Sequence, residues 1–383
     1  MKIVVAAWHL RDFNVGLGRY CRELIDAIGR VDRDNQYDVL MPTDACRFPE
    51  RPNFRYRLIR FPVFRRRFWE QMAPLLVGRY DVLHFPYDSR VAWKRGKFIA
   101  TVHDVKPLLF GALRPRRSFG GVIERILVGD RWAGLDHVVT DSESSRQDLM
   151  RQVGLPAHRV TVVPPGVDPA RFRPAGAEEQ FDVRRSTLAG LKPRTSNLER
   201  RTGPRPYILC VAGSDPTKNV STLVEAFAKL ALPIRETHDL VLVGDVGKRT
   251  EVRDQIVVAG LEKQAVFTGV VSDERLIELY QHAAAFVFPS LYEGFGLPVL
   301  EAMACGCPVI SSNAASLPEV AGDAAILVDP KDTQGFSDAM ARVLADADLR
   351  RDLREKGLTQ AAQFTWDRTA REMVAVYRKV GEG

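Results

Sequence analysis

The residues with the clearest capacity for chemistry lie in Phe286–Asn313, where two acidic side chains flank a glycine-rich segment. Glu293 precedes Gly294-Phe295-Gly296-Leu297, and Glu301 stands eight positions after Glu293. The backbone N–H groups of such a segment, with those of a following helix start, can bind an anionic group such as a diphosphate. The two carboxylates could accept hydrogen bonds from a ribose and from a second sugar. The helix macrodipole alone would also favour Glu301 in a first helical turn, so both interpretations stay open.

The pattern around these residues predicts a strand, a loop, a helix and a second strand. The apolar run Ala283–Phe288 is short and rich in β-forming residues, as in a buried strand. Pro298 suits a helix start because its fixed φ fits there and its missing N–H leaves no bond unmade. Gly306 ends the helix, and Pro308–Ser311 forms the second strand. The loop therefore lies at the carboxyl end of a strand, where open α/β sheets bind ligands.

The segment EGFGLPVLEAMACGCPVI, residues 293–310, resembles the E-x7-E motif of the retaining glycosyltransferases of family 4. The resemblance extends to three further segments, Val266–Gly269, Asp273–His282 and Ser316–Gly322. It implies an α/β protein with the GT-B fold, in which two doubly wound Rossmann-like domains face each other across a cleft. It also implies a nucleotide-diphosphate sugar as donor, with Glu301 at the ribose and Glu293 at the transferred sugar.

Length and composition describe an ordinary globular protein. The 383 residues suffice for two or three domains, and the hydrophobic share of 45% and charged share of 27% are typical. The five cysteines are scattered and odd in number, so we expect buried thiols rather than disulfides or a zinc site. The N-terminal MKIVVAAW is too short for a signal peptide, and no apolar run has the length of a spanning helix. We expect a cytoplasmic protein, or one peripheral on the inner face of the cytoplasmic membrane.

Positive charge gathers in residues 47–79, where arginines alternate with aromatic residues and acidic residues are few. Arginines beside aromatic and apolar side chains suit an anionic membrane surface, where charge attracts and rings insert at the interface. The alternative is a solvated basic face beside ordinary core aromatics, and nucleic acid is the least favoured of the three. An anionic membrane surface is therefore a possible partner of this segment, and we expect no nucleic acid.

A glycine pair, Gly16-Leu17-Gly18, follows the predicted strand Lys2–Ala7 and precedes a helix expected to begin at Tyr20. A loop of this kind either binds an anion or makes a tight turn that needs positive φ. The third glycine and the acidic residue of a dinucleotide fingerprint are missing, so NAD binding is not indicated. The family resemblance implies that Gly16 and Gly18 lie over the phosphates of the donor.

His103 and Asp104 follow a predicted strand, Phe98–Val102, and thus lie at the same edge of the sheet as the glycine pair. They could hold or deprotonate an acceptor hydroxyl, or His103 could only cap the following turn. Their segment resembles the HD motif of the family, which implies an active-site position on the acceptor side. Further along the chain, Asp141 and Ser142 are candidate N-caps of a helix.

Lys218 follows the predicted strand Tyr207–Val211 and precedes a helix. A lysine there can meet a phosphate as a point charge, although a lone lysine is more often simply exposed. The resemblance implies that Lys218 binds the donor diphosphate and that Ser214 stands where the family has an arginine, which leaves the phosphate geometry open. It also implies that Val270, beyond the strand Val266–Thr268, lies beside the nucleobase.

We therefore predict three segments. Residues 1–166 form an N-terminal acceptor-side domain, residues 167–365 form the domain that binds the nucleotide sugar, and residues 366–383 form a helix that returns to the first domain. Within the second domain, residues 173–205 are polar, basic and rich in Pro and Gly, which predicts a mobile surface excursion with a short helix near residues 180–191.

The predicted function is the transfer of mannose from GDP-mannose to a hydroxyl of a glycan or lipid-linked acceptor in cell-envelope polysaccharide synthesis. UDP-glucose or a UDP-N-acetylhexosamine is the alternative donor, and neither a metal nor a further cofactor is expected. A GT-B nucleotide-sugar epimerase and a basic binding module without activity are the remaining hypotheses. The predicted catalytic residues are Glu293, His103 and Asp104, and the predicted donor-binding residues are Gly16, Gly18, Ser214, Lys218, Val270, Phe295, Gly296, Leu297 and Glu301.

Overall fold

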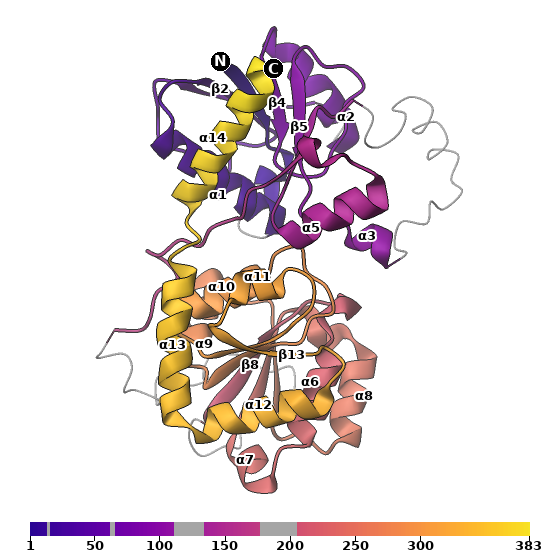
Figure 1. The fold of residues 1–383 in the computed structure, drawn as a ribbon, viewed down its shortest axis with the longest axis vertical. Coiled ribbons are helices and arrows are strands. Elements are labelled where there is room, and N and C mark those ends of the chain that lie inside the picture. Colours follow the sequence, from indigo (N-terminus) through magenta and orange to yellow (C-terminus); the bar gives the residue numbers. More distant parts are fainter. Residues whose placement is uncertain (14–15, 62–65, 111–133, 177–204) are drawn as a thin grey trace. The chain divides into compact units, whose positions relative to one another are not determined.

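The computed structural model describes residues 1–13, 16–61, 66–110, 134–176 and 205–383. These residues form two compact units (Figure 1), one of Met1–Gly166 with Phe364–Gly383 and one of Val167–Gln363. The chain thus leaves the first unit after Gly166 and returns to it with its C-terminal helix. Most of the predicted excursion, including its expected helix, lies outside the described residues.

The first unit is built on a seven-stranded parallel sheet with the strand order β3-β2-β1-β4-β5-β6-β7. The order reverses direction between β1 and β4, as in a doubly wound fold. The strands are β1 (Lys2–Ala6), β2 (Gln36–Met41), β3 (Phe54–Leu58), β4 (Val82–Phe85), β5 (Lys97–Thr101), β6 (His137–Thr140) and β7 (Val160–Val162). Its α-helices in the described residues are α1 (Gly16–Val31), α2 (Arg66–Met72), α3 (Lys106–Leu109), α5 (Glu143–Asp148) and α14 (Trp366–Glu382).

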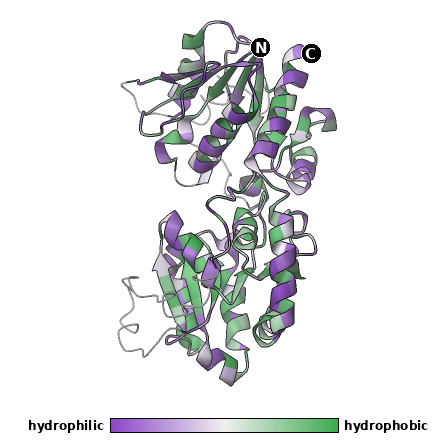
Figure 2. Ribbon diagram, turned by 90° about the vertical axis from the view of Figure 1, so that its left-hand side faces the viewer, coloured by the Kyte–Doolittle hydropathy of each residue, from purple (hydrophilic) through white to green (hydrophobic). Residues whose placement is uncertain are grey.

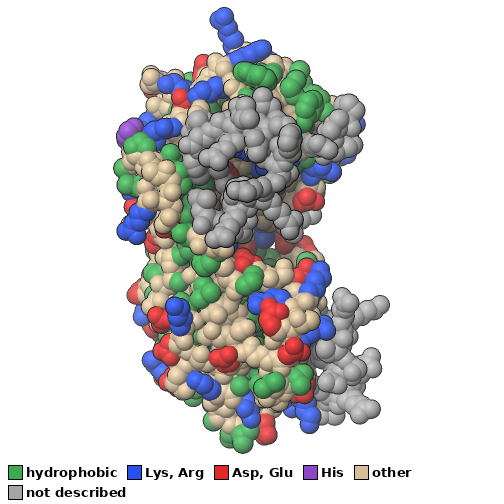
Figure 3. All heavy atoms as spheres, turned by 90° about the vertical axis from the view of Figure 1, so that its right-hand side faces the viewer, with side chains coloured by type: hydrophobic (Ala, Val, Ile, Leu, Met, Phe, Trp, Pro, Cys, Tyr) green, Lys and Arg blue, Asp and Glu red, His purple; other side chains and the backbone are tan. Residues whose placement is uncertain are grey.

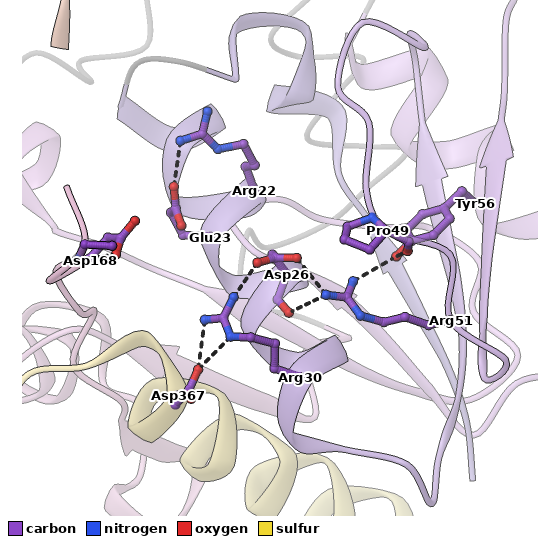
Figure 4. A network of polar contacts seen from close by, with 10 residues as sticks. Arg22, Glu23, Asp26, Arg30, Pro49, Arg51, Tyr56, Asp168 and Asp367 are labelled. Carbon is purple, nitrogen blue, oxygen red and sulfur yellow. Dashed lines mark hydrogen bonds and ion pairs between the residues drawn. The ribbon is translucent and has the colours of Figure 1, made fainter. Parts of the chain in front are cut away.

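The C-terminal helix α14 packs along α1 (Figure 1). Figure 4 shows the polar contacts at the rim of this packing, where Arg30 of α1 lies between Asp26 of the same helix and Asp367 of α14. Asp26 also accepts a hydrogen bond of 2.7 Å from Arg51. The contacts of Arg30 are half-exposed, whereas the side chain of Arg51 is mostly buried. Exposed ion pairs contribute little, so the buried apolar faces of α1 and α14 supply most of the attraction between these two helices.

A buried polar chain also joins α14 to the sheet. The hydroxyl of Tyr377 lies 2.7 Å from Nδ1 of His84 in β4, and Nε2 of His84 lies 2.9 Å from the hydroxyl of Thr101 in β5. Burial lowers the pKa of His84 to about 3, so the ring is neutral and shares its single N–H within this chain. Each polar atom therefore has a partner, as burial requires.

The second unit contains a six-stranded parallel sheet in the order β10-β9-β8-β11-β12-β13, again with a reversal, here between β8 and β11. The strands are β8 (Tyr207–Val211), β9 (Asp239–Val243), β10 (Ala265–Gly269), β11 (Ala285–Phe288), β12 (Val309–Ser312) and β13 (Ala325–Val328). The helices are α6 (Val220–Ala228), α7 (Leu232–Thr237), α8 (Thr250–Val258), α9 (Asp273–His282), α10 (Leu297–Ala304), α11 (Leu317–Ala321), α12 (Thr333–Ala345) and α13 (Ala347–Ala361).

Helices cover both faces of this second sheet. Helix α6 packs against α8 and α12, whereas α10 packs against α9, α11 and α13. Strands enclosed in this way are apolar throughout, and every side chain of β11 is fully buried. Figure 2 shows the consequence, with hydrophobic strands in the interior and helices that alternate between hydrophilic and hydrophobic residues.

The structure confirms the alternating α/β pattern but moves some boundaries. The sequence predicts a helix over Thr333–Ala345, and α12 covers the same residues. Helix α1 begins at Gly16 rather than Tyr20, so the expected loop is its first turn. The sequence also predicts a strand at Arg57–Arg60. The structure instead has β3 at Phe54–Leu58, because the buried ring of Phe54 stacks on Tyr37 of β2 at 4.5 Å and fixes the register.

The five cysteines are buried free thiols, as the sequence predicts. Burial raises the pKa of Cys305 to about 12 and that of Cys46 to about 11. Neither group is therefore a thiolate near neutral pH, and both behave as small apolar side chains.

The substitution Tyr377→Phe is expected to lower the free energy of unfolding by about 1–3 kcal/mol, because it leaves Nδ1 of the buried His84 without a partner. Arg378→Ala, on the same helix, removes only an exposed ion pair with Asp34 and should change stability by less than about 1 kcal/mol. Urea unfolding of both variants measures the difference. Equal stability of the two variants would show that the buried chain does not hold α14 in place.

Candidate active site

The reversal of strand order in the second sheet brings two charged side chains together. Lys218 follows β8, and Glu293 follows β11, the two neighbouring strands from which the chain runs in opposite directions along the sheet. Crevices outside the carboxyl ends of such strands are the usual ligand sites of open α/β sheets. Here the amino group of Lys218 donates a hydrogen bond of 2.7 Å to Oε1 of Glu293.

Glu293 is almost buried, with 8% of its surface exposed. Its Oε1 also accepts a hydrogen bond of 2.6 Å from the hydroxyl of Ser290, while the Lys218 amino group lies 5.1 Å from the centre of the Phe288 ring. The hydroxyl of Ser316 lies 2.9 and 2.7 Å from the backbone carbonyl oxygens of Glu293 and Phe295, between which it shares its single proton, and so holds the loop after β11. The carboxylate is thus held in one position, with Oε2 making no hydrogen bond to any described residue.

The glycine segment ends at the start of α10. Gly296 has a φ of 118°, a backbone conformation that favours glycine, and a Cβ atom there would also lie 2.7 Å from Cδ2 of Leu317. Leu297 is the first residue of the helix. Within the described part of the chain, the amides of Gly296 and Leu297 make no hydrogen bond, so both could donate to an anion.

Glu301 is the fifth residue of α10 and not, as expected, part of its first turn. The macrodipole is felt mainly in the first turn, so this alternative explanation for the residue weakens. Glu301 is only 7% exposed, and its Oε2 accepts a hydrogen bond of 3.2 Å from the hydroxyl of Tyr280 in α9. Tyr280 was not singled out by the sequence, because a tyrosine on an amphipathic helix carries no distinctive signal.

The loop after β8 is fixed by its own side chains. Asp215 accepts hydrogen bonds from the amide and the hydroxyl of Thr217, at 2.9 and 2.8 Å, and so shapes the turn that presents Lys218. Asn219, in the left-handed region at a φ of 55°, donates to the carbonyls of Pro289 and Pro330. Asn219 thereby ties this loop to the loops after β11 and β13, a role that the sequence analysis missed.

Two predicted donor-binding residues lie after the carboxyl ends of β8 and β10, which β9 separates, and make no contact that assigns a role. Ser214 is exposed in the loop after β8. Val270 is 73% exposed directly after β10. The places of both residues agree with the loops in which they were expected, and their functions remain predictions.

His103 does not cap the turn that follows β5, which was one of the two roles that the sequence left open. Its Nδ1 lies 2.7 Å from Oδ2 of Asp141, and its Nε2 lies 3.3 Å from the carbonyl oxygen of Pro86. Asp104 instead caps the turn, because its Oδ1 accepts a hydrogen bond of 3.0 Å from the amide of Lys106. Ser142 is the N-cap of α5, accepting from Ser145, so Asp141 is not needed there.

Gly16 and Gly18 lie in the first turn of α1. A Cβ atom on Gly18 would lie 2.2 Å from the backbone oxygen of Asp12, so this glycine is required for the close packing of two backbone segments. Gly16 has a φ of 48° and nothing within 4 Å of such an atom. The packing requirement explains Gly18 without a ligand, and phosphate contact of the pair stays a prediction.

Many arginines of residues 47–79 are paired within the unit. Four form ion pairs with carboxylates, namely Arg51 with Asp26, Arg57 with Asp38, Arg60 with Asp44 and Arg66 with Glu70. Trp69 is buried and donates to the carbonyl of Ile59 at 2.9 Å. Much of the segment thus fits the alternative of a basic face beside core aromatics. Within the described part of the chain, no helix combines the length and the apolar character needed to cross a bilayer.

Comparison with known proteins identifies the class. The family described as Glycosyltransferase Family 4 matches residues 15–171, and the family described as Glycosyl transferases group 1 matches residues 194–360. A D-inositol 3-phosphate glycosyltransferase of Xylanimonas cellulosilytica is 30% identical over 78% of this chain and 72% of its own length. The chain therefore belongs to the family 4 and group 1 glycosyltransferases, and it is an enzyme of that class.

Two relatives from Escherichia coli are similar over much of the chain. The O-antigen chain mannosyltransferase B is 28% identical over 99% of this chain and 100% of its own length. The serotype-specific mannosyltransferase WbdA is 32% identical over 74% of this chain, but this chain spans only 33% of that protein. The alternatives of an epimerase and of a binding module gain no support from these comparisons.

A solved structure confirms the fold. Sucrose-phosphate synthase from Thermosynechococcus elongatus superposes with a TM-score of 0.73 at 23% identity, covering 99% of this chain and 98% of its own. The two Rossmann-like units of this protein are thus those of the GT-B fold, as the sequence predicts.

The Lys218–Glu293 pair makes a specific prediction for stability. Lys218→Met should lower the free energy of unfolding by about 1–3 kcal/mol, because it leaves a nearly buried carboxylate without its cation. Adding Glu293→Gln to that variant should recover part of the loss, which a double-mutant cycle in urea detects.

The matched control is Lys356→Met, which removes an exposed pair with Asp352 and should cost less than about 1 kcal/mol. Strictly additive effects of the two substitutions at Lys218 and Glu293 would contradict an energetic coupling between them.

Proposed function

We propose that this glycosyltransferase moves mannose from GDP-mannose, with retention of configuration, to a hydroxyl of a glycan or lipid-linked acceptor in the synthesis of a cell-envelope polysaccharide. Two relatives carry the name mannosyltransferase, and the one named for the O-antigen chain matches this chain from end to end. Retention is what the E-x7-E resemblance implies. The nucleotide, the sugar and the acceptor are all parts of the proposal.

The contact between Lys218 and Glu293 carries the proposal. A lysine ammonium has three N–H donors, and Glu293 engages one of them, so the others can meet oxygens of a diphosphate. Oε2 of Glu293 can accept a hydrogen bond from a hydroxyl of the transferred sugar. The amides of Gly296 and Leu297 add donors at the positive end of α10. Lys218 and the two amides thus stabilise the negative charge that grows on the leaving diphosphate in the transition state.

The transfer needs no protein nucleophile in this scheme. A bond forms between the acceptor oxygen and the anomeric carbon of the sugar, on the face from which the diphosphate leaves. The bond from that carbon to the phosphate oxygen breaks, and the proton of the acceptor hydroxyl passes to the leaving diphosphate. Lys218 and the start of α10 supply the positive charge, so the proposal includes no metal ion. Glu301 holds the ribose, and UDP-glucose or a UDP-N-acetylhexosamine is the alternative donor.

A thermal-shift series with GDP, UDP, ADP and their sugar conjugates, without added metal, tests the donor. GDP-mannose at a hundredfold excess over Kd should stabilise the native protein by about 2.7 kcal/mol. Glu293→Gln should reduce the shift with GDP-mannose but leave that with GDP unchanged, because Glu293 meets the sugar.

A thermal shift with UDP sugars alone would identify a UDP sugar, and not GDP-mannose, as the donor. Conversion of a nucleotide sugar into its epimer, in the absence of any acceptor, would favour the epimerase instead.

We also propose that the acceptor is reached at an anionic membrane surface, through a set of exposed side chains that we call the α2 face. Helix α2 contacts the segment after β4, because Gln71 exchanges hydrogen bonds of 2.7 Å with the backbone of Arg90 and Ala92. Figure 3 shows exposed hydrophobic side chains next to Lys and Arg on the first unit. We define the α2 face by exposed side chains of α2, of the segment that follows it and of the segment after β4, namely Phe68, Leu76, Arg79, Trp93 and Arg95.

Apolar rings and arginines together favour the interface of an anionic bilayer. The double variant Leu76→Ser/Trp93→Ser removes two side chains that are 57% and 66% exposed, so it should weaken cosedimentation with vesicles of 30% anionic lipid by about tenfold. The control is Val258→Ser, an 88% exposed apolar residue of the second unit, which should bind vesicles normally. Equal partitioning of both variants would remove the α2 face from the proposal.

A further inference from the structure

The two ring nitrogens of His103 both face hydrogen-bond acceptors. Nδ1 points at the carboxylate of Asp141 at 2.7 Å, and Nε2 points at the carbonyl oxygen of Pro86 at 3.3 Å. A neutral imidazole has one N–H and can satisfy only one of them, whereas a protonated ring satisfies both. The surroundings of His103 are thus arranged for its protonated form.

The groups packed around His103 are consistent with one positive charge at this place. The ring of Tyr20, from α1, stands edge to face against His103 at 4.5 Å and fixes its plane. The neighbouring histidines His84 and His9 are neutral, because burial above all lowers their pKa values to about 3 and about 4. Burial is the largest single influence on His103 and lowers its pKa, but Asp141, the carbonyl of Pro86 and the nearby Asp104 together raise the pKa by more, so the net direction is upward.

The carboxylate of Asp141 is placed to stabilise a positive charge on His103, and the described residues show no other role for it. Asp141 is 5% exposed at the end of β6, and its second oxygen, Oδ1, is buried without a hydrogen bond to any described residue. The helix that follows has its N-cap in Ser142. A carboxylate that is removed from water in this way needs a positive partner, and His103 is the side chain that lies against it.

We propose that Asp141 is a positioning residue that keeps His103 doubly protonated, so that His103 serves the transfer as a hydrogen-bond donor and a fixed positive charge and not as the base. The proposal rests on the proposed function for the identity of the reaction. It agrees with a scheme in which the leaving diphosphate takes the acceptor proton, because a protonated His103 has no lone pair with which to take it.

The two possible roles of His103 predict opposite pH dependence. If the protonated form is the active one, the rate falls as pH rises through the raised pKa of His103. Asp141→Asn keeps the size and a hydrogen-bond acceptor but removes the charge, so it should move this alkaline limb to lower pH by about 1–3 units. If His103 were the base, the rate would instead fall as pH drops, and Asp141→Asn would extend activity to lower pH.

The first measurement is an NMR titration of the ring of His103 in the full-length protein labelled in histidine. The signal is assigned among the seven histidines by its loss in His103→Gln. The pKa of His103 should exceed the ordinary value of about 6.5 and should fall in Asp141→Asn. Glu143→Gln, two residues along the chain, is the matched control and should leave this pKa unchanged.

The second measurement is the pH profile of kcat and kcat/KM for the same proteins, with Asp141→Glu as the conservative variant. The proposal predicts an alkaline limb that shifts in Asp141→Asn and is restored toward its original position in Asp141→Glu. An unshifted His103 pKa in the unmodified protein, or a shift of the acidic limb instead, would overturn the proposal. An inactive unmodified protein whose His103 pKa is raised would support the pair and count against the proposed function.

Discussion

The ion pair of Lys218 and Glu293 exists because the second sheet reverses its strand order between β8 and β11. Only neighbouring strands that send the chain in opposite directions leave a crevice at their carboxyl ends, and the two residues come from those two loops. The strand order brings the two loops together, and hydrogen bonds of the loops fix the two charged side chains. Asn219 joins the loops through backbone carbonyls, and Ser290 holds the carboxylate, so the charges are in position before any ligand arrives.

The first unit also contains a buried pair of ionisable side chains, formed by other residues. His103 and Asp141 follow the adjacent strands β5 and β6, and each would be costly to keep charged alone in its buried setting. Paired, they place one positive ring at the carboxyl edge of the sheet. In both units, therefore, a charge removed from water is matched by a partner from a neighbouring strand end, which restricts the side chain to one position.

The sequence predicted the elements better than the contacts between them. Helix α12 matched to the residue because its apolar period is regular and Asp332 caps its start. The site loops were found because glycine and proline positions and the family motif are local signals. The partnership of His103 with Asp141 could not be found in the same way. The two residues are 38 positions apart, and only the strand order shows that their strands are neighbours. Tyr280 was not predicted either, because a tyrosine on an amphipathic helix carries no distinctive signal.

The most direct measurement of the central claim is hydrogen–deuterium exchange of the full-length protein with and without the nucleotide sugar that gives the largest thermal shift. If the donor binds at the Lys218–Glu293 pair, backbone amides of residues 213–219 and 293–297 should exchange more slowly when it is present. Amides at the opposite end of the second sheet should be unaffected. Unchanged exchange in both loops at saturating donor would contradict the account, because the diphosphate and the sugar would then have to bind elsewhere.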